Sequence, residues 1–150
     1  MAMPNELERL GLPPIDQVGF VVADMDRSIA HYDALFGPFR VVQTRIEGTS
    51  HRGAPSDVEL AIALGRSGDL EIELIQWKSG RSPHREFIEA GREGMHHVRF
   101  RVDDCAAWIA KLAGVGYELV WHKRFSPEIE FAYLERKDDP LIVELLQMKL

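Results

Sequence analysis

Cysteine is almost absent from this sequence, since Cys105 is the only one among 150 residues. An internal disulfide is therefore excluded, which fits a reducing compartment. The chain also has no apolar run of the roughly 20 residues that cross a bilayer. Residues 1–14 carry acidic side chains where a secretory signal would need an apolar core. These absences predict a cytoplasmic protein without a membrane partner.

Excess positive charge is missing as well. The chain has 18 Lys and Arg against 24 Asp and Glu, which gives a formal net charge of -6 and a pI near 5.5. This balance disfavours a broad surface for nucleic acid or anionic lipid. A hydrophobic content of 45% and a charged content of 28% are ordinary for a globular protein of this length. The expected partner is therefore a small molecule.

The sequence does contain an internal repeat. The stretch IDQVGFVVAD at residues 15–24 returns as HHVRFRVDD at residues 96–104. A shift of 80 positions places Gln17 on His97 and Asp24 on Asp104, with three apolar positions matching between them. A second match, EIELIQ at residues 71–76 against IVELLQ at residues 142–147, places Glu73 on Glu144. Two matches in the same order indicate a duplication.

Each half predicts the order strand, helix and three strands. The first half has strand-like stretches at residues 15–22, 39–46, 58–64 and 70–77, and a helix at 25–36. The second has strands at 97–102, 117–125, 130–135 and 141–146, and a helix at 105–113. Asp24 is expected to cap the first helix, and Asp103-Asp104 the second. Residues 47–57 predict a long loop, and residues 78–95 a polar connector with a short helix at 83–90. We predict one α+β domain, residues 1–150, with repeats at about 15–77 and 96–147.

Four polar residues stand on otherwise apolar strands at matching places of the two halves, namely Gln17, Glu73, His97 and Glu144. A carboxylate between apolar strand residues is costly unless it is exposed, paired or bound to a metal. One nitrogen and three oxygens would suit Zn²⁺, Ni²⁺, Co²⁺, Mn²⁺ or Fe²⁺. The alternative is that the glutamates face solvent and the histidine is an ordinary core or surface residue.

With these residues in place, the sequence resembles the vicinal oxygen chelate superfamily, which includes glyoxalase I, methylmalonyl-CoA epimerase, extradiol dioxygenases and bleomycin-resistance proteins. The resemblance covers residues 15–147. It implies paired βαβββ modules that form a cupped, incomplete eight-stranded barrel around one divalent metal, with helices outside. It also implies that the metal ligands are Gln17, Glu73, His97 and Glu144.

The ligand set separates members of this superfamily. A Gln, Glu, His, Glu set resembles some glyoxalase I enzymes, and IELIQW at residues 72–77 is similar to their second-ligand strand. REFIEAGREGMHHVRFRVDD at residues 85–104 instead resembles methylmalonyl-CoA epimerases, which usually have His where Gln17 stands. Extradiol dioxygenases also need a histidine there. A bleomycin-resistance-like binding protein needs no such ligands. A non-catalytic binding protein remains the alternative.

The resemblance implies a lyase, isomerase or epimerase reaction on a small, anionic acyl thioester or hemithioacetal. The metal polarises a carbonyl, and a glutamate moves the proton from the neighbouring carbon. Glu144 is the first candidate for this base and Glu73 the second, whereas Glu47 is a weak match to an additional base of the epimerases. The resemblance also implies a homodimer.

Strand alternation suggests which other side chains face the substrate. If His97 faces the barrel interior, so do Arg99 and Arg101, and either could bind an anionic group or pair with an acid such as Glu71. By the same alternation Gly19 would leave room for a ligand beside Gln17.

Further candidates and exclusions follow from position in the sequence. His51 with Arg52, in the expected loop, could close over the ligand, and Phe131 and Tyr133 could form an aromatic wall or belong to the core. Alternation points His96 away from His97. The remaining histidines are expected at the surface, and they are His31, His84 and His122.

Overall fold

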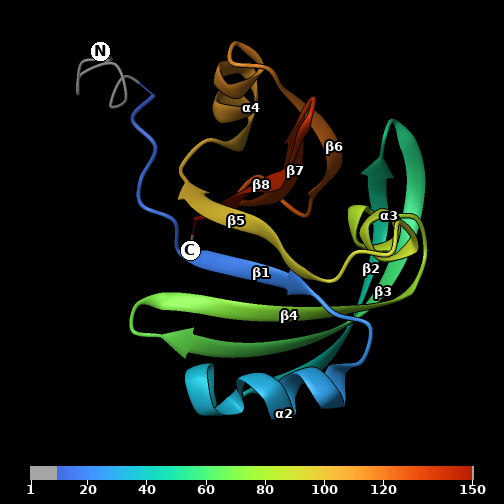
Figure 1. Cartoon of the computed structure of the whole chain (residues 1–150). Helices are drawn as coiled ribbons and strands as arrows, with labels where there is room; N and C mark the ends of the chain where they lie inside the picture. Colours follow the sequence, from blue (N-terminus) through green and yellow to red (C-terminus); the bar gives the residue numbers. More distant parts are fainter. Residues whose placement is uncertain (1–9, 150) are drawn as a thin grey trace.

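The computed structural model describes residues 10–149 (Figure 1), so the first nine residues of the predicted lead-in lie outside it. The described part of the chain holds eight strands and three helices. The helices are α2 (Met25–Phe36), α3 (Pro83–Glu89) and α4 (Cys105–Ala113). No helix in residues 10–149 is long and apolar enough to cross a membrane.

The strands form two groups of four that share one order. The first-half strands are β1 (Gln17–Val21), β2 (Arg40–His51), β3 (Ala54–Ser67) and β4 (Leu70–Ser79). The second-half strands are β5 (Gly94–Val102), β6 (Tyr117–Arg124), β7 (Ile129–Arg136) and β8 (Asp139–Met148). The spatial order is β1-β4-β3-β2 in one group and β5-β8-β7-β6 in the other. The α+β class and the eight strands are therefore as predicted.

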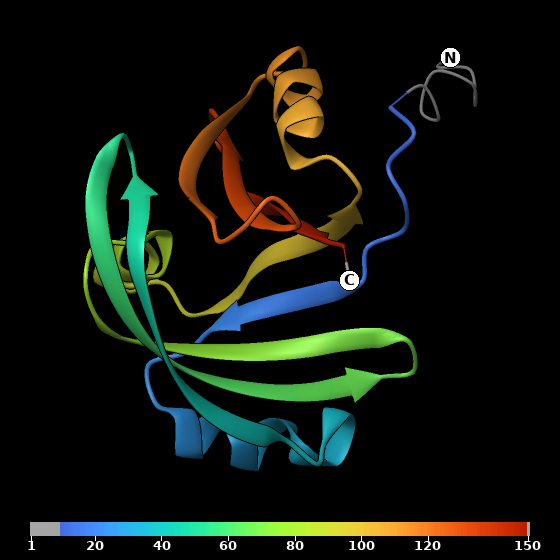
Figure 2. The ribbon, with the colours of Figure 1, turned by 180° about the vertical axis from the view of Figure 1, so that it is seen from behind.

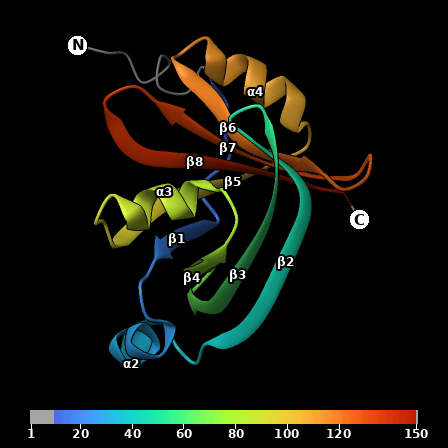
Figure 3. The ribbon, with the colours of Figure 1, turned by 90° about the vertical axis from the view of Figure 1, so that its right-hand side faces the viewer.

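The barrel is closed, which corrects the prediction of an incomplete one. β1 pairs with β5 on one side, and β2 reaches β6 on the other (Figure 3). The second junction is short, because it pairs only Ser50 with His122 and His51 with Trp121 within the described residues. Closure depends on β2 extending to His51, five residues beyond the strand end that the sequence predicts.

Residues 47–57 are a hairpin with a bulge, and the predicted long loop is wrong. β2 and β3 are joined by a two-residue turn, Arg52 and Gly53, with φ values of 49° and 82°. Positive φ at both central residues is typical of the turn that matches the twist of a hairpin. Gly48 has φ 70° where the register shifts between Ile46 and Thr49. The glycine-rich composition therefore reflects a bulge and a tight turn.

Two helices cover the outside of the barrel at equivalent places (Figures 1 and 2). The carboxylates of Asp24 and Asp104 accept hydrogen bonds from the backbone of Arg27 and Ala107, as predicted for helix caps. The core under α2 is formed by Val22, Met25, Ala61, Ala63 and Leu74. The core under α4 is formed by Val102, Cys105, Leu112, Ala132, Leu134, Val143 and Leu145. Each module thus buries its own helix.

Cys105 should not react with thiol reagents while the protein is folded. Its side chain is completely buried in the core under α4, and burial, together with nearby acidic groups, raises the pKa of the thiol to about 12. At pH 8 the folded protein should therefore show no rapid reaction with a chromogenic disulfide reagent, and unfolding in guanidinium should release one reactive thiol per chain. Rapid modification of the native protein would contradict this burial.

Candidate metal centre

The four ligand candidates stand on four adjacent strands of the barrel. Gln17 lies on β1, Glu73 on β4, His97 on β5 and Glu144 on β8, and the strands run in the order β4, β1, β5, β8. β1 pairs in parallel with β4 and antiparallel with β5, so that Gly19 stands opposite both Glu73 and His97. The first and last strands of both modules are thereby brought together, and their polar side chains meet inside the barrel.

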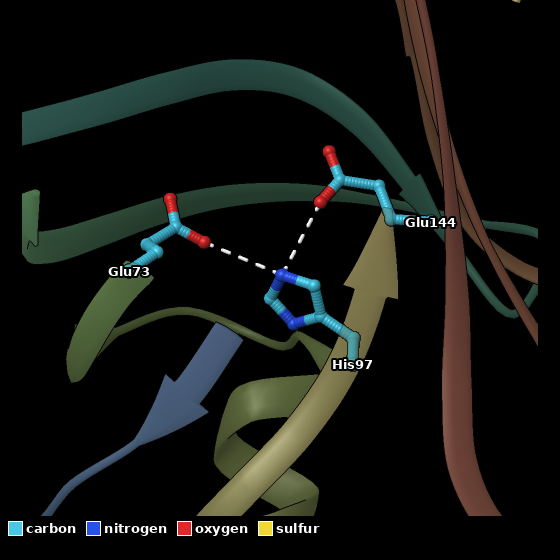
Figure 4. A group of neighbouring side chains, drawn as sticks. All are labelled: Glu73, His97 and Glu144. Carbon is cyan, nitrogen blue, oxygen red and sulfur yellow. Dashed lines mark ion pairs between the residues drawn. The ribbon is translucent and has the colours of Figure 1, made fainter. Parts of the chain in front are cut away.

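Three oxygen atoms converge on one nitrogen of His97, and Figure 4 shows the two that belong to Glu73 and Glu144. The Nε2 atom lies 3.1 Å from Oε1 of Gln17, and 3.3 Å from Oε1 of both Glu73 and Glu144. One N–H can be directed at only one of these acceptors. The Oε1 atom of Glu73 is buried without a hydrogen-bond partner in the described part of the chain. The cluster therefore has more acceptors than its own protons can satisfy.

The spacing of these atoms fits one bound dication. Zinc lies about 2.0–2.2 Å from nitrogen and oxygen ligands, so two ligands of one tetrahedral or octahedral ion are roughly 3.0–3.5 Å apart. The measured separations from His97 Nε2, 3.1 to 3.3 Å, fall in that range. The donor set and its spacing thus agree with the predicted metal site.

The orientation of the Gln17 amide is fixed by a neighbour. Its Nε2 donates a hydrogen bond to Oε1 of Glu71 at 2.7 Å, which turns its own Oε1 toward His97. Gln17 is 1% exposed and His97 is fully buried. The amide therefore presents an oxygen to the cluster, as a metal ligand must.

The electrostatics of the cluster favour positive charge. Burial lowers the pKa of His97, but the Glu144 and Glu73 carboxylates raise it more strongly, and the resulting pKa is about 9. The side chains of the two glutamates are only 10% and 12% exposed. Two buried carboxylates thus need a cation between them, which is a proton on His97 or a metal ion in its place.

Gly19 leaves room for His97 and not for a ligand, which corrects the sequence interpretation. A Cβ atom at this position would lie 2.1 Å from Cε1 of His97. Because no side chain fits there, only glycine lets the imidazole pack across β1. The imidazole of His97 occupies the space that the sequence analysis assigned to substrate.

A pocket of about 140 Å³ opens beside the cluster. It is lined by Glu73, Arg99, Glu144, Ile46, Leu60, Ile62, Ile75, Trp121, Phe131, Tyr133 and Leu146. The aromatic wall is joined to the core, since the ring centroids of Trp121 and Phe131 are 4.5 Å apart. Sequence reasoning anticipated Phe131 and Tyr133 but missed Trp121. The signal for Trp121 was a large aromatic residue inside a predicted strand. That strand carries none of the four metal-ligand candidates, so the sequence did not indicate whether Trp121 faces the interior of the barrel.

Arg99 reaches this pocket, but its charge is already paired. Its guanidinium donates to both carboxylate oxygens of Asp16, at 2.9 and 3.1 Å, and lies 3.6 Å from Glu71. This is the ion pair that the sequence offered as the alternative to substrate binding. Arg99 therefore lines the pocket as part of a neutralised group.

The other proposed substrate-binding residues lie elsewhere. Arg101 is exposed, and its guanidinium donates a hydrogen bond to the backbone oxygen of Met148. It lies two residues beyond Arg99, which is about 6.6 Å further along β5. His51 is buried at the end of β2, with Nε2 3.5 Å from Glu86 of α3, in a different pocket. Glu47 is exposed and paired with Arg45. The alternation of side chains along a strand predicted which face of the sheet a residue occupies, but not how far along the strand the pocket extends.

Two histidines depart from their expected positions. His84 is fully buried, 3.3 Å from the hydroxyl of Tyr133, and burial lowers its pKa to about 3. His96 is also buried, and its Nδ1 is 3.0 Å from Nδ1 of His97. His31 is exposed as expected, whereas His122 is half-buried and paired with Glu130.

Comparison with known proteins gives the same fold. Among curated proteins no sequence match was found. A methylmalonyl-CoA epimerase from Mycobacterium tuberculosis is similar in structure, with a TM-score of 0.64, 22% identity, and coverage of 93% of this chain and 90% of that one. A variant of Streptomyces coelicolor methylmalonyl-CoA epimerase in complex with 2-nitronate-propionyl-CoA has a TM-score of 0.60 and 22% identity, over 93% and 99% of the two chains.

A third solved structure, a methylmalonyl-CoA epimerase in complex with methylmalonyl-CoA and NH4+, has a TM-score of 0.60 and 23% identity over 91% and 95% of the chains. At such identities the likeness concerns the fold. The sequence itself matches the model of the glyoxalase/bleomycin resistance protein/dioxygenase superfamily over residues 16–133. With two matching four-stranded groups joined around one polar cluster, this chain belongs to the glyoxalase/bleomycin resistance protein/dioxygenase superfamily.

Proposed function

We propose that this chain is a metal-dependent isomerase, epimerase or lyase that removes a proton from the carbon next to the carbonyl of a small acyl thioester or hemithioacetal. The observation that carries the proposal is the convergence of three oxygens on Nε2 of His97 at one end of a pocket. Family membership and the epimerase structures of the same fold support the reaction class.

Gln17, Glu73, His97 and Glu144 would hold the metal. One nitrogen and three oxygens suit Zn²⁺, Ni²⁺, Co²⁺, Mn²⁺ or Fe²⁺, and the two carboxylates balance the charge of a dication. When bound, such an ion acts as a Lewis acid that makes the C–H bond next to a carbonyl more acidic. Gln17 and His97 are neutral ligands, so the cluster as a whole is left without net charge.

Proton transfer is assigned to the glutamates. Glu73 and Glu144 both line the pocket, and Figure 4 shows one oxygen of each carboxylate toward His97 and the other directed away from it. The outward oxygen of Glu144 is the first candidate for the base, and that of Glu73 the second. Because the two carboxylates come from β4 and β8, on either side of β1 and β5, one could remove a proton and the other return it.

The size of the pocket limits what lies next to the glutamates. Its volume of about 140 Å³ is below the usual range for a site that encloses a whole organic ligand. Only the reacting acyl or aldehyde portion fits inside, so a thioester carrier or thiol adduct would extend outward. Among the described residues that line the pocket, Arg99 is the one cationic side chain, and an anionic group would have to compete with Asp16 for its guanidinium.

A non-catalytic binding protein of the same fold is the second candidate. Eight of the eleven pocket-lining side chains are aliphatic or aromatic, which favours an apolar compound. Ring-cleaving dioxygenase chemistry is disfavoured, because Gln17 stands where such an enzyme requires a histidine. A bound dication would distinguish the leading proposal from a non-catalytic binding protein, and Gln17 distinguishes it from the dioxygenase.

Protein purified without chelator should bind one divalent metal per chain. Glu73→Gln and Glu144→Gln should each weaken Co²⁺ or Zn²⁺ binding by roughly tenfold or more, because each loses a charged ligand. Glu59→Gln on β3, an exposed glutamate paired with Arg45, is the matched control and should bind like the parent protein. Competition with a chromophoric chelator measures the affinities. Unchanged binding in both pocket variants would remove these residues from the metal site.

Gly19→Ala should damage the site without replacing any of the four proposed metal ligands. The added methyl group would overlap the imidazole of His97, so we expect a loss of about 1–3 kcal/mol in unfolding free energy and weaker metal binding. Gly114→Ala, at the C-cap of α4, is the control: its added Cβ would meet the backbone oxygen of Lys111 at 3.2 Å, a tight contact that a shift of a few tenths of an ångström relieves, against 2.1 Å at Gly19. Denaturant unfolding and metal titration test both variants. A Gly19→Ala protein with parental affinity would show that His97 does not need this space.

The metal-loaded protein should exchange the acidic proton of its substrate with solvent. Incubation with methylmalonyl-CoA in heavy water tests epimerisation by mass spectrometry, and conversion of the methylglyoxal–glutathione adduct tests the lyase reaction. Glu144→Gln should slow the active reaction by roughly 10²–10⁴-fold, as expected for loss of a general base. Lack of both activities in the metal-loaded protein, together with binding of an apolar compound that Glu144→Ala leaves intact, would favour the binding protein.

A further inference from the structure

His96 is placed against His97 by an irregularity in β5. The pairing of β1 with β5 joins Gly19 to His97 and then Phe20 to Met95, so that His96 has no partner on β1. One extra residue on one strand is a β-bulge, which changes the direction of a side chain and often lies beside a functional site. Neighbouring residues of a regular strand point to opposite faces, whereas these two rings meet.

The two imidazoles share one hydrogen bond. Their Nδ1 atoms are 3.0 Å apart and their ring planes are perpendicular, at 89°. A bond between two ring nitrogens needs a proton on one and a lone pair on the other. The Nε2 atom of His97 faces the three oxygens, and it can bind a metal only without its proton. Neutral His97 then carries its proton on Nδ1, and Nδ1 of His96 accepts it.

The position of His96 is itself fixed from the other side. Its ring packs edge-on against Phe87 of α3, with centroids 4.9 Å apart, and lies 5.4 Å from the ring of His84. The side chain is 2% exposed. Contact with α3 therefore fixes the buried imidazole of His96, and His96 can in turn fix the ring of His97.

We propose that His96 is a positioning residue, which fixes the tautomer and ring orientation of His97 so that Nε2 is the atom offered to the metal. This inference rests on the metal centre of the proposed function. Histidine ligands usually donate their second N–H to a carboxylate, a carbonyl or water. Here a neutral imidazole takes that place. Glu73 and Glu144 already match a dication, and a carboxylate acceptor would add a third negative charge.

The experiment compares two substitutions of His96. His96→Leu removes the acceptor and keeps an apolar side chain, whereas the Oδ1 atom of His96→Asn can occupy the place of Nδ1. We expect His96→Leu to weaken Co²⁺ and Zn²⁺ binding by roughly 10–100-fold and to alter the visible spectrum of bound Co²⁺. His96→Asn should recover most of both properties. His31→Leu, at an exposed histidine of α2 outside the cluster, is the control and should resemble the parent protein.

The outcomes separate this inference from the proposed function. If the parent protein binds no Co²⁺ or Zn²⁺, the metal centre fails and His96 loses its role with it. If the parent binds one ion and a folded His96→Leu protein shows the same affinity and spectrum, only the role of His96 is overturned. Equal losses in the Leu and Asn variants would assign the effect to packing and also overturn it. Thermal unfolding of the metal-free proteins confirms that each variant is folded.

Discussion

Two buried carboxylates that share one imidazole nitrogen are the constraint on which the centre of this barrel depends. Burying an ionised carboxylate costs several kcal/mol unless a cation and hydrogen bonds compensate it. Glu73 and Glu144 are both 3.3 Å from Nε2 of His97, so one group must serve both. Gln17 adds an oxygen and no charge. The cluster therefore stays balanced only with a positive charge in its middle, and the strands around it hold that geometry.

The surroundings of His97 show how little freedom the ring has. Gly19 gives it the space across β1, the three oxygens face Nε2, and His96 contacts Nδ1. Apolar and aromatic side chains then line most of the pocket beside this cluster. A site built in this way has its polar atoms oriented before any ligand arrives, which lowers the cost of reorganisation during binding or reaction.

The sequence predicted much of this arrangement, because the internal repeat constrained it twice. The alignment of Gln17 with His97 and of Glu73 with Glu144 selected the four side chains that meet, and Asp24 and Asp104 marked two helix starts. Alternation failed where strand geometry is irregular. A bulge turned His96 toward His97. The prediction for His51 failed for another reason, because the expected loop is a hairpin and His51 ends β2. The proposed duplication stays a prediction, since shared strand order alone does not establish it.

The short junction between β2 and β6 gives the closed barrel one weak joint. β1 and β5 are paired along five residues, whereas β2 and β6 pair only at Ser50–His122 and His51–Trp121 in the described residues. One further backbone hydrogen bond, from Arg52 N to Val120 O, supports this shorter junction. Trp121 belongs both to that joint and to the pocket wall. The shorter of the two junctions between the four-stranded groups therefore contains a residue that also lines the pocket, so a change in the pairing of β2 with β6 would alter the pocket wall.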